Sequence, residues 1–310
     1  MDNALFVPSV ARLEWLHELL PWLSQAELPV AGRRFVDYGL ENAKKFGYGA
    51  VGIIDWHFSK RLFADCSALM ARGLPVFYHP GKGDLPRGLD DLKRIVSPFT
   101  NPLADGLAVV WGLCLTNHKV EETAYEEISP EECEDTPTGV YVRRNGGWSR
   151  MLPRAVAVSD VRSWQRLSLM VLENPSLFTL PGYSAEEGVH LGRNVVLERG
   201  ARLRPPVIMQ DNTWCSRNVR LDGDVIVGQR SFIGEGARLK RTIVGDDTYV
   251  GMGLDLEDKI VVGHRVIDAE NGHWTDVEEP GVAQYLGRGG ISWLHRLWRF
   301  LRGTSYGRSR

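Results

Sequence analysis

An aliphatic or similar side chain recurs at every sixth position between Leu191 and Leu254, and this period constrains the fold more than any other feature of the chain. The positions are Leu191, Leu197, Leu203, Met209, Cys215, Leu221, Val227, Ile233 and Leu239, after which the register slips by one residue to Val244 and Val250. A period of six matches neither an α-helix, at about 3.6 residues per turn, nor an alternating strand, at about two. It predicts a solenoid of short strands, each with one large and one small side chain inside.

Two further columns follow the same period. Four positions after each large residue lies a small or β-branched one: Val195, Ala201, Val207, Thr213, Val219, Val225, Ser231, Ala237 and Ile243. The residue just before this column is turn-like at Asn194, Gly200, Pro206, Asn212, Asn218, Asp224 and Gly236. Asn, Asp and Gly tolerate positive φ, so this column can form corners. The pattern resembles the left-handed parallel β-helix of hexapeptide-repeat proteins, with about eleven hexads in three to four triangular coils.

The residues before the repeat predict an α/β domain over positions 1–180. Helical patterns occupy four segments: the leucine-rich part of residues 1–28, and residues 35–46, 59–72 and 161–173. Apolar runs typical of strands cover residues 50–54, 74–78 and 107–115. Such alternation indicates a mostly parallel sheet. The acidic stretch 121–135 is predicted to be a solvated loop or a short helix. We place the solenoid at 184–268 and a basic helical tail at 281–310.

One segment of the predicted α/β domain carries a family resemblance. Residues Leu28–Glu41, LPVAGRRFVDYGLE, resemble a stretch of the sugar-phosphate nucleotidyltransferases, which make nucleotide sugars. Many members of that family also carry a C-terminal left-handed β-helix. The resemblance implies a glycine-rich phosphate loop, an arginine and a lysine that neutralise phosphate charge, and carboxylates that hold Mg²⁺. The ligand-binding candidates that it suggests are Arg12, Arg33, Arg34 and Asp160.

The chain departs from the family at the positions that carry the chemistry. Residues 9–13, where the phosphate loop is expected, contain no glycine. Gln25 stands where a lysine is expected, and Leu113 where a metal-binding aspartate is expected. Asp160 either matches a second metal carboxylate or caps the helix that begins near Val161. Arg33 and Arg34 are either ligand contacts or solvent-facing side chains. We therefore predict no catalytic residue, no metal ligand and no cofactor.

Two functions from different classes remain open. The first is a catalytically inactive nucleotidyltransferase-like protein with a regulatory or scaffolding role in nucleotide-sugar or surface-polysaccharide metabolism. The alternative is an active sugar-phosphate nucleotidyltransferase with an altered site, which would need Mg²⁺. A more distant third is acyl transfer on the solenoid, where a catalytic histidine is required. His190 and His264 flank the repeat, although a lone histidine at a solenoid end is more often structural.

The tail from Gly281 to Arg310 has six arginines and no acidic residue. It forms a short amphipathic helical pattern, whose candidate contact residues are Trp293, Leu297, Trp298, Arg299 and Arg302. Such a helix can lie on an anionic membrane surface beside polysaccharide-synthesis enzymes, or it can pack on another subunit or cap the solenoid. Both alternatives stay open at this point.

Composition bounds the remaining expectations. A formal net charge of −2 argues against a nucleic-acid partner. The four cysteines form no C-x-x-C pair, which fits a reducing compartment. No signal peptide or run long enough to span a membrane is evident. We therefore expect a cytoplasmic homo-oligomer, with any membrane contact peripheral and on the inner face.

Overall fold

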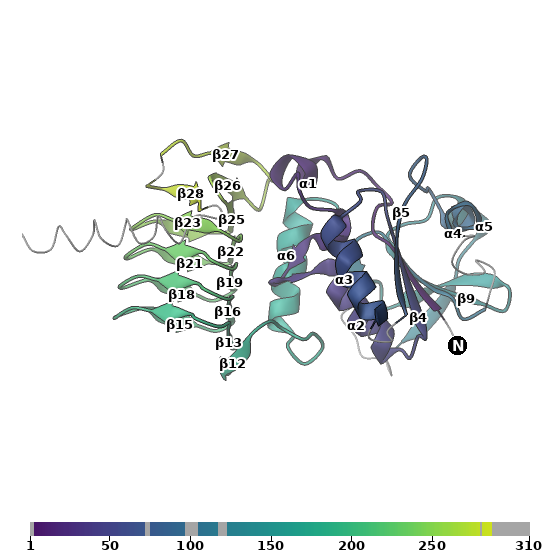
Figure 1. Ribbon diagram of the computed structural model, residues 1–310, viewed down its shortest axis with the longest axis horizontal. Helices are drawn as coiled ribbons and strands as arrows, with labels where there is room; N and C mark the ends of the chain where they lie inside the picture. Colours follow the sequence, from purple (N-terminus) through teal and green to yellow (C-terminus); the bar gives the residue numbers. More distant parts are fainter. Residues whose placement is uncertain (1–2, 72–74, 97–104, 117–122, 280, 287–310) are drawn as a thin grey trace, which may run out of the picture. The chain divides into compact units, whose positions relative to one another are not determined.

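The computed structural model describes residues 3–71, 75–96, 105–116, 123–279 and 281–286. The chain divides into two compact units, Met1–Thr179 and Leu180–Arg310. Figure 1 shows a sheet with helices in the first unit and a stack of short strands in the second. Each unit is described by itself below.

The first unit is built on a seven-stranded sheet in the order β5-β4-β1-β6-β9-β10-β8. Its strands are β1 (Asn3–Val7), β4 (Ala50–Asp55), β5 (Val76–Pro80), β6 (Ala108–Trp111), β8 (Ala124–Glu127), β9 (Gly139–Arg144) and β10 (Gly147–Leu152). Strands β5, β4, β1 and β6 pair in parallel, and β9, β10 and β8 extend the sheet by antiparallel pairing. The predicted parallel-rich α/β sheet is confirmed, with an antiparallel extension. Two short pairs, β2 (Pro29–Val30) with β3 (Arg33–Arg34) and β7 (Cys114–Leu115) with β11 (Val156–Ala157), lie outside it.

The central strand β1 was not predicted, because residues 1–28 were interpreted as helical. Among residues 3–28, which the structure describes, only α1 (Glu14–Leu19) is an α-helix. Ala4 and Phe6 pack into the apolar cluster on one side of the sheet, and Leu5 and Val7 into the cluster on the other. A strand buried on both faces is a continuous apolar run, so its period does not distinguish it from a buried helix.

The helices cover both faces of the sheet. Helices α2 (Phe35–Lys45) and α3 (Lys60–Ala71) supply Val36, Leu62 and Cys66 to the cluster that contains Phe6. The 3₁₀ turn η2 (Leu89–Asp91) and α4 (Leu92–Val96) supply Leu89 and Leu92 to the opposite cluster. Together with α6 (Val161–Glu173), α2 and α3 confirm the predicted helices at 35–46, 59–72 and 161–173. A second 3₁₀ turn, η1 (Gln25–Glu27), precedes β2.

The acidic stretch 121–135 differs from its prediction in one part. Helix α5 (Pro130–Glu134) is the expected short helix, but β8 is an unexpected strand that pairs with β10. The β8 strand is exposed along its length and lies at the sheet edge. Its pairing is supported by Arg150 of β10, which lies 3.8 Å from Glu126 and 2.6 Å from Glu132. The cation opposite these carboxylates makes a strand possible where composition alone favoured a loop.

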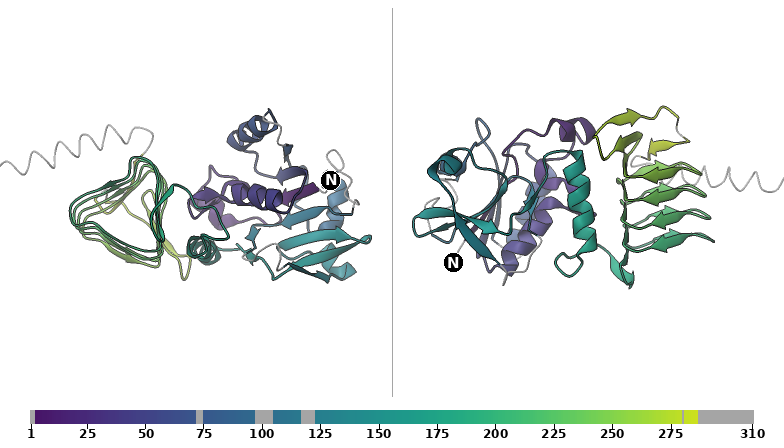
Figure 2. Two further views of the ribbon diagram at one scale, coloured as in Figure 1. Left: turned by 90° about the horizontal axis from the view of Figure 1, so that it is seen from below. Right: turned by 180° about the vertical axis from the view of Figure 1, so that it is seen from behind.

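The second unit consists of short strands stacked in three parallel sheets. The first sheet joins β13 (Val189–Leu191), β16 (Val207–Met209), β19 (Val225–Val227), β22 (Thr242–Val244) and β25 (Lys259–Val262). The second joins β14 (Val196–Leu197), β17 (Trp214–Cys215), β20 (Phe232–Ile233) and β23 (Thr248–Val250), and the third joins β15 (Arg202–Arg204), β18 (Arg220–Asp222), β21 (Arg238–Lys240) and β24 (Asp255–Glu257). Figure 2 shows a triangular section when the stack is viewed end-on. This arrangement of parallel strands is compatible with the predicted β-helix.

Antiparallel strands close the two ends of the stack. Strand β12 (Tyr183–Glu186) pairs with β13 at the first coil. After the last coil, β26 (Arg265–Asp268) pairs with β25 and β27 (Trp274–Asp276) pairs with β26. Strand β28 (Ala283–Tyr285) pairs with β23. These strands cover both ends of the first sheet and the last strand of the second, whereas the third sheet ends at β15 and β24 without an antiparallel neighbour.

The predicted inward columns fill the core of the second unit. Leu221, Val227 and Ile233 are fully buried, so the predicted register is confirmed. Leu203 is only partly buried, and Leu197 is 41% exposed. Both belong to the first coil, whose strands β14 and β15 have a parallel neighbour on one side only. The apolar period therefore predicts inward direction better than it predicts full burial.

The register slip occurs where one turn is a residue shorter. Val225 pairs with Thr242 and Val227 with Val244, 17 positions on, whereas earlier coils repeat every 18. Thr242, which is fully buried, therefore takes the small inward position that we assigned to Ile243. That assignment was wrong, because the small column slips together with the large one. Ile243 pairs with Ile226 instead.

The corner column is confirmed at all but one of its predicted positions. Asn194, Asn212, Asn218 and Asp224 have φ between 55° and 60°, and Gly200 and Gly236 also have positive φ. Pro206 has no positive φ, since its ring fixes φ near −65°. Arg230 and Arg241 occupy further left-handed corners, which disfavour a long side chain. Each forms a two-pronged pair with an aspartate, Arg230 with Asp247 and Arg241 with Asp258.

Truncation of an inward side chain tests the stacked core. We expect Ile233→Ala to lower the free energy of unfolding by about 2–5 kcal/mol, because it leaves a cavity between neighbouring coils. The matched control is Leu197→Ala in the first coil, which should cost less because Leu197 is already 41% exposed. Urea unfolding followed by circular dichroism measures both. Equal losses of stability in the two variants would contradict the buried position of Ile233 and the partly exposed position of Leu197.

Candidate functional site

The parallel strands define where a ligand site is expected in the first unit. In open α/β sheets, ligands bind beyond the carboxyl ends of the strands, at the point where strand order reverses. From β1, the chain continues to β4 and β5 on one side and returns to β6 on the other. The candidate site therefore comprises the segments that follow Val7, Asp55 and Trp111. Each is described in turn.

The segment after β1 is closed by a buried glutamine. The Gln25 side-chain amide donates a hydrogen bond to the carbonyl of Ala11 at 2.9 Å, and Gln25 is 4% exposed. Gln25 stands where the family resemblance places a lysine, and its side chain fixes the backbone of the segment in which that resemblance places a phosphate loop. Arg12 points outward, with its side chain 71% exposed and its guanidinium 3.1 Å from Glu14. Of the four predicted ligand-binding residues, Arg12 and Asp160 are exposed, whereas Arg33 and Arg34 are half-buried.

The segment after β6 is packed and apolar. Leu113 is 2% exposed, and its carbonyl accepts a hydrogen bond from the backbone N–H of Val158 at 2.8 Å. The preceding Gly112 has a φ of +79°, and a β-carbon there would lie 2.7 Å from Oγ1 of Thr138. The close contact and the positive φ both require glycine. The position at which the family places a metal aspartate is thus part of the core.

A buried polar cluster, which we did not predict, fills the space between these segments. Asp55 is fully buried, and it accepts hydrogen bonds from the Ser9 hydroxyl at 2.6 Å and from the His57 backbone N–H at 3.2 Å. Nearby, Ser24 donates to Glu27 at 3.2 Å, and both side chains are buried. Burial raises the pKa of the Asp55 carboxyl above its ordinary value, so the carboxyl holds its proton more tightly than an exposed one.

The signal for this cluster was present in the sequence. Ser9 follows β1 by two residues and Asp55 is the last residue of β4, so both lie at carboxyl ends of adjacent parallel strands. Without β1, the pair could not be recognised. The cluster does not form a metal-binding set: in the part of the chain that the structure describes, no group of three or more His, Cys, Asp or Glu side chains could hold an ion.

Arg33 and Arg34 are held by the protein's own acceptors. Arg33 donates to Glu41 at 2.9 Å and to the Thr179 carbonyl at 2.6 Å, and its guanidinium lies 4.9 Å from the centre of the Tyr38 ring. Arg34 forms a two-pronged pair with Asp37 and a further bond to Asp65 at 2.5 Å. Both side chains are less than a quarter exposed.

Asp160 caps a helix. Its carboxylate accepts a hydrogen bond from the Ser163 backbone N–H at 2.7 Å, and the Ser163 hydroxyl accepts one from the Asp160 N–H at 2.9 Å. This is the reciprocal arrangement of a capping box at the start of α6. The hydrogen bond from the Ser163 N–H lowers the pKa of Asp160. The Trp15 indole donates to the Ser159 carbonyl at 3.0 Å and thereby joins α1 to this turn.

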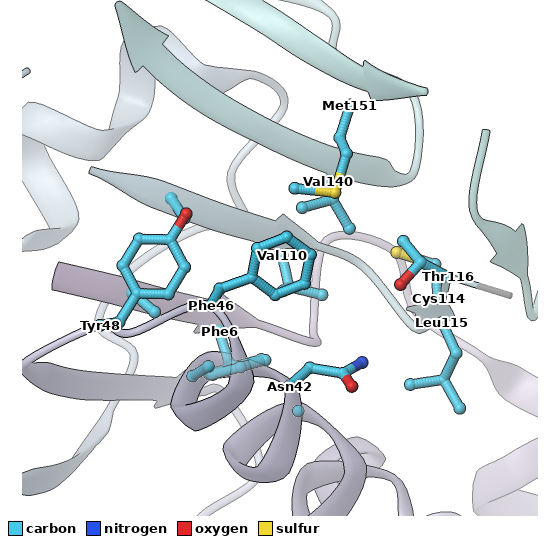
Figure 3. Close-up of a pocket in the computed structure, with 14 residues that line it drawn as sticks. Phe6, Asn42, Phe46, Tyr48, Val110, Cys114, Leu115, Thr116, Val140 and Met151 are labelled. Atoms are coloured by element: carbon cyan, nitrogen blue, oxygen red, sulfur yellow. The ribbon is translucent and has the colours of Figure 1, made fainter. Parts of the chain in front are cut away.

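Two cavities lie away from the carboxyl ends of the strands. A groove of about 490 Å³ is lined by charged residues of β3 and α2, including Arg33 and Lys44, and by Ala50 and Val76 at the amino ends of β4 and β5. A second cavity of about 40 Å³ lies between α2 and the sheet, lined by Phe6, Phe46, Val110 and Met151 among others (Figure 3). Its lining is almost entirely apolar and its volume suits a few water molecules at most. This smaller cavity therefore does not provide a nucleotide site.

The histidines considered for acyl transfer lie at opposite ends of the stack. His190 is in β13 of the first coil, and burial lowers its pKa. His264 follows β25, with Nε2 3.6 Å from an Asp276 carboxylate oxygen. The two belong to opposite ends of the first sheet, so they cannot act together within one chain.

The tail candidates Trp293, Leu297, Trp298, Arg299 and Arg302 lie outside the described residues. None of the helices within those residues combines the length and apolar content that a membrane crossing requires.

The cap at Asp160 gives a pH-dependent prediction. We expect Asp160→Ala to lower the free energy of unfolding by about 1 kcal/mol at pH 7. Because the folded pKa is lowered, this contribution is present above the unfolded pKa, near 4, and is lost as pH falls through the folded value. Asp160→Asn is the matched control, since asparagine also caps helices. Stabilisation of the wild type by Mg²⁺ that both variants abolish would contradict the capping role.

Gln25 gives a second prediction. We expect Gln25→Lys to cost about 2 kcal/mol or more, because it places a charge at a buried position and disturbs the bond to Ala11. The matched control is Trp22→Lys, which adds the same charge where the side chain is 62% exposed. Thermal unfolding compares the two. Equal stability would mean that a lysine at position 25 reaches solvent or an anion, and the segment after β1 would then be open.

Comparison with known proteins gives a partial match. No protein-family model matches the chain. The chain is 33% identical over 125 residues to the bifunctional protein GlmU of Paraburkholderia phymatum. The match covers 32% of this chain and 28% of that protein, so the chain spans less than a third of the relative's length.

Proposed function

We propose that this chain is a nucleotidyltransferase-like protein of nucleotide-sugar or surface-polysaccharide metabolism that does not catalyse nucleotidyl transfer and acts as a regulator or scaffold. Three observations support the proposal. Residues 28–41 resemble the sugar-phosphate nucleotidyltransferases, the chain is similar to a GlmU protein over 125 residues, and a parallel-rich α/β sheet precedes stacked parallel coils. In this proposal the coils are a left-handed parallel β-helix.

The loss of catalysis rests above all on the carboxyl ends of β1 and β6. Phosphoryl transfer needs cations that stabilise charge developing on the phosphates. At these ends the chain presents a buried neutral amide, Gln25, and a buried leucine, Leu113. The polar groups that are present, Ser9, Asp55 and Glu27, supply hydroxyl and carboxyl groups and no cation that could neutralise a triphosphate.

The four candidate residues have different roles in this proposal. Arg33 and Arg34 stabilise α2 and its neighbours through ion pairs, and Asp160 caps α6. Arg12 is left as a surface contact for an anionic group, since its side chain is 71% exposed. We further propose that the protein is a cytoplasmic homo-oligomer whose tail contacts a membrane surface, a polysaccharide-synthesis enzyme or another subunit.

A pyrophosphate assay tests the proposal. With Mg²⁺, each common nucleoside triphosphate and a panel of sugar 1-phosphates, we expect no release above a no-protein blank. We also expect no activity in the double variant Gln25→Lys with Leu113→Asp, because the glycine-rich phosphate loop is still missing. An active nucleotidyltransferase assayed in parallel is the control for the conditions. Magnesium-dependent release by the wild type would favour the alternative, an active enzyme with an altered site.

A further inference from the structure

The third parallel sheet of the second unit presents a column of arginines on its outer face. Arg202 pairs with Arg220, and Arg220 with Arg238, in register on successive coils. All three are exposed. Strands β15, β18 and β21, which carry them, lie directly above one another in Figure 1. Neighbouring strands are about 4.8 Å apart, so the column holds three cations at close spacing.

The protein neutralises only one end of this column. Arg238 lies 2.6 Å from Asp222 and 3.7 Å from Asp255. Asp222 also forms an ion pair with Arg204, whose Nε lies 3.6 Å from an Asp222 carboxylate oxygen. For Arg202 and Arg220, by contrast, no carboxylate of the described residues lies within ion-pair distance. Like charges directly opposite on adjacent strands destabilise a sheet, so an external anion at Arg202 and Arg220 would relieve a repulsion that the protein leaves in place.

The sign of the charge changes along the same face. The outward positions of the fourth coil are Asp255 and Glu257, both exposed, whereas those of the first coil are Arg202 and Arg204. A planar anionic membrane laid on this face would meet the carboxylates of the fourth coil as well as the arginines. A narrow anionic chain that crosses the first two coils would meet the arginines and avoid the exposed carboxylates of the fourth coil. The one carboxylate on its path across β15 and β18, Asp222, has a side chain that is only 9% exposed and is paired with Arg204 and Arg238.

The outer face of the third sheet also lacks the aromatic and apolar side chains through which proteins bind nucleic acids and membranes. The outward residues of β15, β18, β21 and β24 are charged throughout: Arg202, Arg204, Arg220, Asp222, Arg238, Lys240, Asp255 and Glu257. Single-stranded nucleic acids are bound largely by stacking of bases on aromatic side chains, and membrane-surface helices insert apolar ones. Neither kind of side chain is available here. Guanidinium groups do pair well with carboxylate and sulfate groups.

We infer that the Arg202–Arg220 column binds an anionic polysaccharide. The choice of a polysaccharide, rather than another flexible polyanion, rests on the proposed function. The chain lies across β15 and β18, and its carboxylate or sulfate groups bridge the guanidinium groups of adjacent coils. Arg204 flanks this track, and Asp222 holds Arg204 and Arg238 in position. The site needs no pocket, because a repeating ligand binds a repeating surface through several weak contacts.

Binding of polygalacturonate by the full chain tests this inference. At low ionic strength we expect measurable binding that weakens with added salt, because exposed charges are screened over about 10 Å at 0.1 M. We expect Arg202→Gln with Arg220→Gln to bind at least about tenfold more weakly. The matched control, Arg61→Gln with Arg193→Gln, removes the same charge from exposed residues elsewhere and should bind as the wild type does. Neutral dextran should not bind.

Stability gives an independent measurement. Because Arg202 and Arg220 repel each other, the double variant should have a thermal midpoint equal to or above that of the wild type, so weaker binding cannot be attributed to unfolding. The inference is overturned if the two double variants bind polygalacturonate equally, or if an oligo-dT or vesicles rich in phosphatidylserine bind more tightly through the same arginines. The binding measurements are independent of the pyrophosphate assay, which measures catalysis. Failure of this inference is therefore distinguishable from failure of the proposed function.

Discussion

The second unit depends on the requirement that each inward side chain stacks on its counterpart one coil away. Val207, Val225 and Thr242 follow one another in this way, as do Met209, Val227 and Val244. A coil cannot bury these side chains alone, because its strands have only two to four residues and its core is one side chain wide. The repeat length is therefore enforced at every turn, and a turn that is one residue shorter shifts both inward columns together. Corner residues must then adopt the positive φ that the stack requires, even where the residue is an arginine. At Arg230 and Arg241, ion pairs with aspartates one coil away offset the cost of this backbone conformation.

This requirement explains how much of the fold could be predicted. A period that is repeated over many coils is visible in a single sequence, and its inward residues were identified except where Ile243 was assigned a place that belongs to Thr242. The first unit has no such repetition. Helices α2, α3 and α6 have an apolar face and were predicted nearly to the residue. Strand β1 is only five residues long and buried on both sides, so its five residues carry no alternation that would distinguish it from the helix that follows.

The residues of the candidate site that can be compared with a family pattern differ from those that only the fold brings together. Gln25 and Leu113 could be compared with a family pattern one position at a time. The pairing of Ser9 with Asp55 depends on two strands 46 positions apart becoming neighbours, which sequence alone does not give. Likewise, Arg33 and Arg34 could not be assigned from their positions, because their partners Glu41, Asp65 and Thr179 are brought to them by the fold.

Arg33 and Arg34 of the first unit differ from Arg202 and Arg220 of the second in whether the protein pairs them, and this difference bears on function. In the first unit the arginines closest to the family pattern have acceptors of the protein's own at hydrogen-bond distance, and the carboxyl ends of the strands hold acids and neutral amides. An anion that binds Arg33 or Arg34 would have to displace part-buried ion pairs. On the third sheet of the second unit, Arg202 and Arg220 are exposed and repel each other, so an anion gains their charge without breaking an existing pair. On the repeat, a substitution on one coil is placed in register with those on the next, so small contacts with an anion add along the stack.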